Sequence, residues 1–175
     1  MKRLILVFSA GLLAQFSAFS TEMPKVGDKA PDFSVAASDG TTAHLKDYLG
    51  KGAIILYFYP KDDTKGCTAE ACGIRDTMEE FKGLNATVLG VSFDSVESHK
   101  AFIEKYHLPF LLLADTDKKV AKAYGVADDR SKVASRVTFV IDKNGKIAFV
   151  DPKVNPATHA AELRAVLANM APNFI

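Results

Sequence analysis

Tryptophan is absent from the 175 residues, cysteine occurs only twice, and the charged side chains nearly cancel to a net charge of +1. No run of basic residues is longer than a pair, so the chain lacks the positive patch that binds phosphate backbones, and nucleic acid is excluded as a partner. With 48% hydrophobic and 25% charged residues, the sequence predicts one domain with a core that needs no disulfide. No internal repeat or low-complexity segment divides the chain.

The first twenty residues have the pattern of a secretory signal. Two basic residues precede an apolar stretch at residues 4–13, and small side chains suit cleavage after Ser20. The alternative is an uncleaved membrane anchor, but the segment from Leu4 to Phe19 has 16 residues, which is short for a span, and it includes Ser9, Gln15 and Ser17. We therefore predict a signal peptide at 1–20 and a domain at 21–175 that is exported to a bacterial periplasm, without stable membrane association after cleavage.

Both cysteines lie in residues 60–72, between a β-rich apolar run at 53–59 and a segment with apolar side chains at helical spacing. The stretch is therefore a connection from a strand to a helix. Pro60 has no amide proton and ends the strand, and Thr64 is of a residue type that caps helices. Cys67 consequently falls in the first helical turn, where free backbone amides favour a thiolate over a thiol.

The spacing from Cys67 to Cys72 limits what this pair can do. Five residues along a helix place the two Cα atoms roughly 8.6 Å apart, whereas a disulfide needs less than about 7 Å. A bond between them would also close a loop of about six residues, which stabilises a fold by only about 2 kcal/mol. The pair therefore suits a redox cycle with local unwinding better than a structural disulfide; metal binding is the remaining alternative.

Pro60, Thr64 and Cys67 match the Pro-x-x-x-Thr-x-x-Cys signature of peroxiredoxins, and the chain resembles this family from about Pro24 to its C-terminus. A second cysteine five positions after the first resembles the bacterioferritin-comigratory, or Q-type, branch, in which both cysteines belong to one chain. Where the common pattern continues Cys-Pro-Thr-Glu, this chain has Cys-Thr-Ala-Glu, a departure associated with the same branch.

The resemblance implies a role for each cysteine. Cys67 is expected to be peroxidatic and Cys72 resolving, in an antioxidant enzyme that reduces hydrogen peroxide and organic hydroperoxides at the expense of thiols. A sulfenic acid on Cys67 would condense with Cys72 to an intramolecular disulfide, which a thioredoxin-like dithiol protein resets. No cofactor or metal is implied, and resolution within one chain favours a monomer.

Peroxide reduction also needs groups that hold the peroxide and stabilise the departing oxygen. The backbone amides of Gly66 and Cys67 can donate to it, and the Thr64 hydroxyl can accept from it, either instead of or together with a plain capping role. The resemblance selects Arg136 as the active-site cation, because peroxiredoxins carry their arginine just before such a strand; the alternative is a solvated strand-end arginine. Glu70 is expected either to orient an arginine or to lie on the helix surface. The other arginines considered are Arg75, Arg130 and Arg164.

The order of predicted elements indicates an α/β fold. Strands are expected at 34–37, 42–45, 53–59, 86–93, 110–114, 136–142 and 146–151, and helical segments at 45–49, 68–81, 95–107, 118–124 and 156–170. Gly83 is expected to end the second helical segment, and Asp115 to cap the fourth. A central mixed sheet flanked by helices, with an N-terminal hairpin, resembles the thioredoxin fold with peroxiredoxin additions.

Two other functions are considered. An exported thioredoxin-like thiol-disulfide oxidoreductase would carry Cys-x-x-Cys, usually after tryptophan, and this chain has neither. A copper-binding module would join the cysteines to a histidine, but none has a ligand-like partner in the sequence. His44 is expected to be an exposed hairpin residue, and the others lie in or beside predicted helices: His99, His107 and His159.

Overall fold

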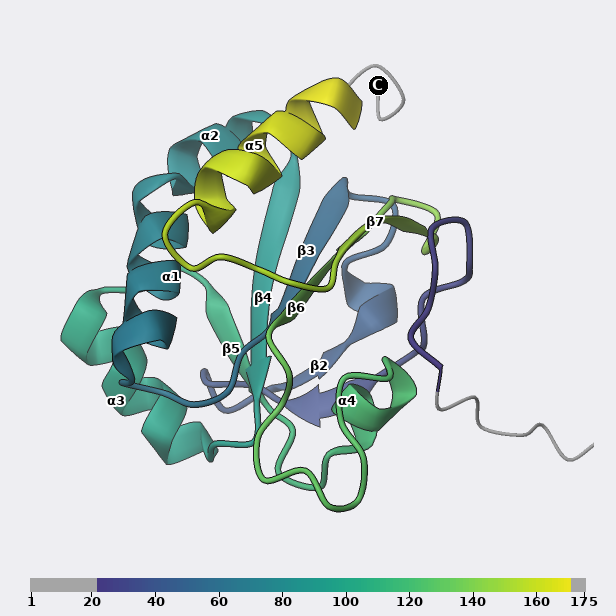
Figure 1. Cartoon of the computed structure of the whole chain (residues 1–175). Coiled ribbons are helices and arrows are strands. Elements are labelled where there is room, and N and C mark those ends of the chain that lie inside the picture. The colour runs from purple at the N-terminus through teal and green to yellow at the C-terminus, as the bar shows by residue number, and fades with distance from the viewer. Residues whose placement is uncertain (1–21, 171–175) are drawn as a thin grey trace, which may run out of the picture.

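The computed structural model describes residues 22–170, so the predicted signal at 1–20 lies outside the described residues. A five-stranded sheet in the order β5-β4-β3-β6-β7 forms the centre, and β1 and β2 pair as a separate hairpin (Figure 1). The strands are β1 (Ser34–Ala36), β2 (Thr42–His44), β3 (Ala53–Phe58), β4 (Ala86–Ser92), β5 (Leu111–Ala114), β6 (Val137–Ile141) and β7 (Ile147–Asp151). The helices are the short 3-10 helix η1 (Leu45–Asp47), α1 (Lys65–Asp76), α2 (Met78–Gly83), α3 (Val96–Tyr106), α4 (Lys119–Ala123) and α5 (His159–Met170).

The central strand of the sheet is β3, which pairs in parallel with β4 and antiparallel with β6. All six of its residues are buried, because both faces of the sheet are covered, and this accounts for its unbroken apolar sequence. The mixed sheet with its N-terminal hairpin confirms the predicted α/β, thioredoxin-like fold. None of the helices between residues 22 and 170 is both long and apolar enough to cross a membrane.

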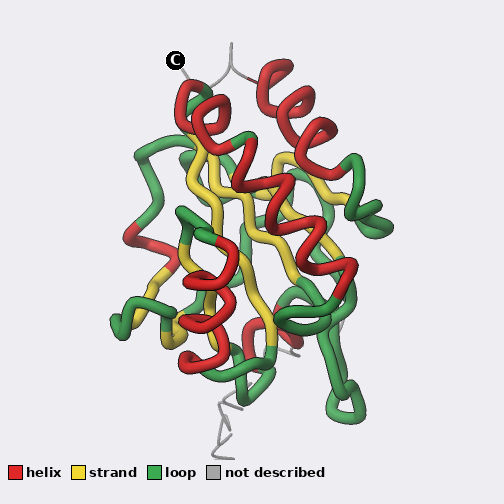
Figure 2. The backbone as a smooth tube through the Cα atoms, turned by 90° about the vertical axis from the view of Figure 1, so that its left-hand side faces the viewer, coloured by secondary structure: helices red, strands yellow, loops and turns green. Residues whose placement is uncertain are grey.

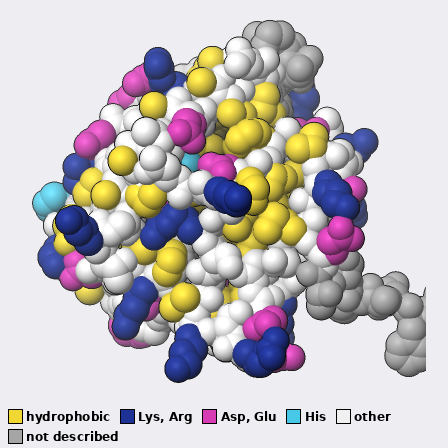
Figure 3. All heavy atoms as spheres, viewed as in Figure 1, with side chains coloured by type: hydrophobic (Ala, Val, Ile, Leu, Met, Phe, Trp, Pro, Cys, Tyr) yellow, Lys and Arg dark blue, Asp and Glu magenta, His cyan; other side chains and the backbone are white. Residues whose placement is uncertain are grey.

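Two layers pack on the sheet (Figures 1 and 2). Helices α1, α2, α3 and α5 cover one face, where their apolar side chains meet Ile55, Tyr57 and Tyr59 of the β3 region. Helix α4 and the β1–β2 hairpin cover the other face, against Leu56 and Phe58. On the side of the molecule shown in Figure 3, acidic and basic side chains are interspersed and hydrophobic ones gather near β6 and β7.

The helix predicted at 68–81 starts earlier and consists of two helices, α1 and α2, joined at Thr77. The Thr77 hydroxyl donates to the carbonyl oxygen of Gly73 at 2.9 Å, and its amide donates to that of Ile74 at 3.1 Å. A threonine that bonds back to the preceding turn in this way bends a helix. The apolar spacing was uninterrupted across Thr77, so the periodicity gave no sign of the break.

The residues that start and end helices were only partly predicted. Helix α2 ends at Gly83, as predicted, but the left-handed conformation that leads into β4 is taken by Asn85, with φ of 53°. Asparagine tolerates this conformation better than most residues. The predicted cap of α3 is confirmed, since the Ser95 side chain accepts from the Ser98 amide at 3.3 Å.

Asp115 caps α4 from a distance. Lys118 occupies the N-cap position, and the buried carboxylate of Asp115 accepts hydrogen bonds from the amides of Val120, at 3.0 Å, and Ala121, at 2.7 Å. Burial raises the pKa of Asp115 to about 6, although these two hydrogen bonds oppose the shift. The folded state therefore holds a proton on this carboxyl well above the pH at which the unfolded chain releases it.

Asp115→Asn is expected to remove part of the pH dependence of stability. As pH rises from 3.8 to about 6, the unfolded carboxyl ionises before the folded one, so the free energy of unfolding of the wild type falls by about 3 kcal/mol through this titration. Asparagine does not titrate. Urea unfolding of both proteins between about pH 4 and pH 7 measures their free energies of unfolding. If the difference between wild type and variant in this free energy stays constant across this pH range, the assignment is contradicted.

Candidate active site

Cys67 lies in the first turn of α1, as predicted, and is only 2% exposed. The helix begins after Thr64, and its first hydrogen bond runs from the Thr68 amide to the Thr64 carbonyl oxygen at 2.8 Å. The amides of Gly66 and Cys67 precede this bond and have no acceptor inside the helix. No acidic residue lies in the first turn to compete for their partial positive charge, so the helix start favours an anion at the sulfur.

Arg136, the residue before β6, contacts Cys67 directly. Its Nη2 donates to the Cys67 sulfur at 3.2 Å, and its Nη1 forms an ion pair with Oε2 of Glu70. Burial lowers the pKa of the Arg136 guanidinium, but the Glu70 carboxylate and the Cys67 sulfur outweigh this effect, and the pKa is raised. The guanidinium is therefore a fixed cation, held between a carboxylate and the sulfur.

Glu70 is 1% exposed, so the surface alternative for this residue is wrong and the orienting role agrees with the structure. Its second oxygen, Oε1, lies 3.0 Å from Nδ1 of His159 at the start of α5. This is an ion-pair distance without hydrogen-bond alignment, since neither atom has a hydrogen-bond partner. His159 is buried, whereas the sequence placed it only in the predicted helix at 156–170 and gave no sign of burial.

The remaining predicted site residues lie around this centre. Pro60 follows β3, and Thr64 occupies the N-cap position of α1, as predicted. Its side chain makes no capping hydrogen bond, because the hydroxyl donates to the Lys61 carbonyl oxygen at 3.2 Å. Because Thr64 bonds back into the loop, the helix-start amides are left without a side-chain acceptor. A Cβ atom at Gly66 would lie 3.4 Å from Nη2 of Arg136, so a glycine leaves the guanidinium its room.

Cys72 is one further turn along α1, is partly exposed, and is a free thiol like Cys67. The helix is continuous from Lys65 to Asp76, so it is intact between the two cysteines. Helix geometry keeps their Cα atoms beyond the reach of a disulfide. A bond between them therefore requires this part of α1 to unwind.

A buried network that the sequence analysis missed anchors the loop before α1. The Asp62 carboxylate accepts hydrogen bonds from the Tyr59 hydroxyl at 2.6 Å and the Ser98 hydroxyl at 2.7 Å, and lies 2.9 Å from Nδ1 of His99. Nε2 of His99 lies 3.2 Å from the Leu113 carbonyl oxygen. Burial raises the pKa of Asp62, but hydrogen bonds from His99 and Tyr59 outweigh it, and the pKa is lowered.

The next residue, Asp63, anchors the same loop on its outer side. It adopts a left-handed conformation with φ of 54°, and its carboxylate accepts from Lys105 at 2.7 Å and from the Tyr106 hydroxyl at 2.6 Å. The Asp62 amide donates to Asp94 at 2.9 Å. Helix α3 and the end of β4 therefore hold the loop that presents Thr64 and Cys67.

The other arginines form ion pairs with acidic residues elsewhere: Arg75 with Asp76, Arg130 with Asp128, and Arg164 with Glu80. No group of three or more His, Cys, Asp or Glu side chains within residues 22–170 is arranged to hold a metal ion.

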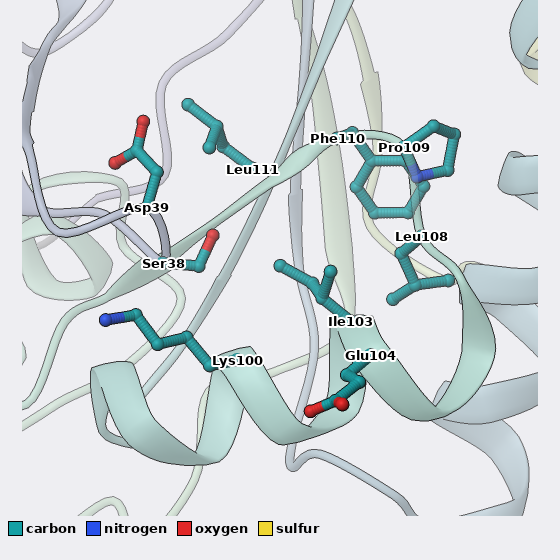
Figure 4. Close-up of a pocket in the computed structure, with 9 residues that line it drawn as sticks. All are labelled: Ser38, Asp39, Lys100, Ile103, Glu104, Leu108, Pro109, Phe110 and Leu111. Carbon is teal, nitrogen blue, oxygen red and sulfur yellow. The ribbon is translucent and has the colours of Figure 1, made fainter.

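A groove of about 390 Å³ lies between α3 and β5 (Figure 4), where Ile103 rises from the helix among mostly apolar neighbours. Neither cysteine nor Arg136 lines this groove, so it is separate from the site around Cys67.

Comparisons with known proteins agree with this geometry. Residues 26–150 match the AhpC/TSA family. The chain is 46% identical over 145 residues to the putative peroxiredoxin Bcp of Coxiella burnetii, covering 79% of this chain and 95% of the relative. It is 44% identical over 153 residues to peroxiredoxin Bcp of Bacillus subtilis, covering 84% and 97%. The crystal structure of peroxidoxin BcpB from Mycobacterium tuberculosis matches with a TM-score of 0.79 at 34% identity, covering 84% of this chain and 98% of that chain.

A thioredoxin-like fold with a buried cysteine at a helix start, held by an arginine, defines a thiol peroxidase. The chain belongs to the AhpC/TSA family, and its relatives named Bcp and peroxiredoxin Q confirm the branch that the sequence resembles.

Proposed function

We propose that Cys67 is the peroxidatic cysteine of this thiol peroxidase. Its thiolate attacks one peroxide oxygen, the O–O bond breaks, and the sulfur becomes a sulfenic acid while the departing oxygen leaves as water or an alcohol after taking up a proton. The amides of Gly66 and Cys67 and the Arg136 guanidinium are the donors that stabilise negative charge on that oxygen. The Thr64 hydroxyl donates its proton to the Lys61 carbonyl oxygen, and the lone pairs of its own oxygen accept from the incoming peroxide.

The contact between Arg136 and Cys67 is the observation that carries this proposal. A guanidinium nitrogen 3.2 Å from a buried sulfur stabilises the thiolate, and the thiolate is the nucleophile in reactions of this kind. A structural cysteine in a core has apolar neighbours and needs no such partner. The peroxide substrate is inferred from this chemistry and from the names of the relatives, one of which is described by its alkyl peroxide reduction activity.

We further propose that Cys72 resolves the sulfenic acid. Its thiol attacks the oxidised sulfur, a disulfide forms, and the oxygen leaves as water with the thiol proton. A dithiol protein of the thioredoxin type then reduces the disulfide and becomes oxidised itself. Because both cysteines belong to one chain, the cycle needs no second subunit, and we propose a monomer, which analytical ultracentrifugation tests.

Cys72→Ser is expected to stop turnover after one oxidation. The variant should consume one equivalent of peroxide and gain one oxygen atom on the peptide that contains Cys67, whereas the wild type should lose two hydrogen atoms and form the internal disulfide. Intact-mass and peptide-mass measurements distinguish the two products. Oxygen found on any peptide without Cys67, or steady turnover of the variant with a dithiol protein, would contradict the assignment of these roles.

We also propose that residues 1–20 direct export and are removed after Ser20, which places the enzyme in a bacterial periplasm. The support is the sequence pattern of this segment and the start of the family match at residue 26. N-terminal sequencing of the protein from a periplasmic fraction tests this: a chain that starts at Thr21 supports export, and a full-length chain in the cytoplasm contradicts it.

A further inference from the structure

Five buried side-chain atoms have no hydrogen-bond partner within residues 22–170, and they belong to only four residues. They are the Tyr57 and Thr138 hydroxyls, Oε1 of Glu70 and both ring nitrogens of His159. A buried polar atom without a partner destabilises the folded state, and such atoms are few in folded proteins and require an explanation.

The four side chains lie on the face of the sheet that α1 and α5 cover. Tyr57 of β3 is the cross-strand partner of Thr138 of β6, so the two side chains share one face. The Tyr57 ring lies 6.4 Å from the His159 ring, centroid to centroid, and His159 lies 3.0 Å from Glu70. Each of the four residues is at most 1% exposed, so they form one buried polar cluster.

The buried polar cluster is connected to the reactive sulfur. Glu70 faces His159 with one carboxylate oxygen and pairs with Arg136 through the other, and Arg136 donates to Cys67. The single negative charge of Glu70 thus lies between a fixed cation and a side chain that can become a cation. A positive charge on His159 would offset the negative charge of Glu70, and this changes the net electrostatic potential at the Cys67 sulfur.

His159 is the group of this cluster suited to change its charge near neutral pH. Burial, and then the nearby charge of Glu70, raises the pKa of Tyr57 well above its usual range, so that hydroxyl stays neutral, and Thr138 does not titrate. Glu70 of α1 and Tyr57 of β3 face His159, and Arg136 before β6 pairs with the other oxygen of Glu70. On α5 itself, Arg164 pairs with Glu80 of α2, where both side chains are more than half exposed.

We propose that His159 is a positioning residue whose protonation against Glu70 strengthens the action of Arg136 on the Cys67 sulfur; this rests on the proposed role of Cys67. While the imidazole is neutral, Arg136 alone balances Glu70. An imidazolium offsets the negative charge of Glu70 from the opposite side. The net positive potential at the Cys67 sulfur then rises, and the thiolate is stabilised. The thiolate is thereby favoured at acidic pH, where protons in solution oppose it, and the enzyme keeps its activity to a lower pH.

His159→Gln tests this by single-turnover oxidation of Cys67, followed in rapid-mixing experiments from about pH 5 to pH 9. We expect the wild type and the variant to react at similar rates at the alkaline end, where the imidazole is neutral. At about pH 6 the variant should be about tenfold slower, the size of a one-unit shift in an ionisation. His107→Asn is the matched control, because His107 is exposed at the end of α3 with φ of 52°, a conformation that asparagine tolerates.

The shape of the pH profile separates positioning from structural damage. A loss of rate by the same factor at every pH, or a profile identical to that of the wild type, would overturn the proposal. If neither the wild type nor the variants form a sulfenic acid on Cys67 at any pH, the proposed function itself fails. If the wild type and His159→Gln both form it at the same rates, only the role of His159 fails.

A second measurement does not depend on the variant folding. Coupling between two sites is reciprocal, so the thiolate of Cys67 must raise the pH at which His159 titrates. NMR titration of the His159 ring in the wild type and in Cys67→Ser is expected to show a lower midpoint in the serine protein. Equal midpoints in these two proteins would overturn the proposal without any activity measurement.

Discussion

Cys67→Ser is expected to reduce peroxide consumption to the uncatalysed background while the fold remains intact. Serine has nearly the same shape, so it fills the same space beneath α1 in the core where Cys67 packs. Its hydroxyl, however, does not ionise near neutral pH, even beside Arg136 and the free amides of the helix start. The nucleophile is therefore lost although every group that would stabilise it remains.

The measurement is consumption of hydrogen peroxide with an excess of a dithiol protein, together with thermal unfolding to establish that the variant is folded. Cys72→Ser is the matched control, because it also loses a sulfur from α1 but should still complete one oxidation. Peroxide consumption by Cys67→Ser at the wild-type rate would show that the attacking atom is elsewhere in the chain.

The parts of the site that are contiguous in sequence could be predicted from sequence. Pro60, Thr64 and Cys67 lie within one strand-to-helix connection, and the apolar run before them identified the buried strand β3. Arg136 is 69 residues from Cys67, and residue pattern alone did not distinguish it from three other arginines. The family resemblance selected it, because the position before the strand at 137–141 is what the members share.

Pairings between distant buried polar residues could not be predicted in this way. Helical spacing assigns a residue to a face, but it does not show what lies opposite, so Glu70 was equally consistent with the surface. His99 contacts Asp62 across 37 residues, and His159 contacts Glu70 from a helix at the other end of the chain. Both histidines are polar residues in amphipathic segments, where solvent exposure is the usual reading.

Glu70 also connects the two chemical steps of the proposed cycle. It lies between Cys67 and Cys72 on α1, so unwinding of this segment to form the disulfide must move its carboxylate away from Arg136 and His159. The loop before Cys67 is held separately, because its residues Asp62 and Asp63 bond to side chains of α3. Formation of the disulfide is therefore expected to separate Glu70 from Arg136 and His159 while the loop stays in place. Reduction is expected to restore the helix and these charge contacts together.

Arg136→Gln is expected to lower the rate of Cys67 oxidation by about 10²–10³-fold, the usual loss when one donor to a developing oxyanion is removed. Glutamine keeps a hydrogen-bond donor but removes the charge that favours the thiolate, and it leaves Glu70 buried beside His159 without its cation. Single-turnover oxidation of the variant measures the loss. Arg164→Gln is the control, because Arg164 pairs with Glu80 where both side chains are more than half exposed.

Arg136→Lys separates charge from geometry at the same position. Lysine keeps the positive charge, but its single ammonium group cannot reach Glu70 and the Cys67 sulfur through two directed nitrogens as the guanidinium does. If the fork geometry matters, the lysine variant should recover only part of the rate lost in Arg136→Gln, because Glu70 and the sulfur then compete for one group. Full recovery with lysine would show that positive charge alone suffices, and wild-type rates in both variants would remove Arg136 from the mechanism.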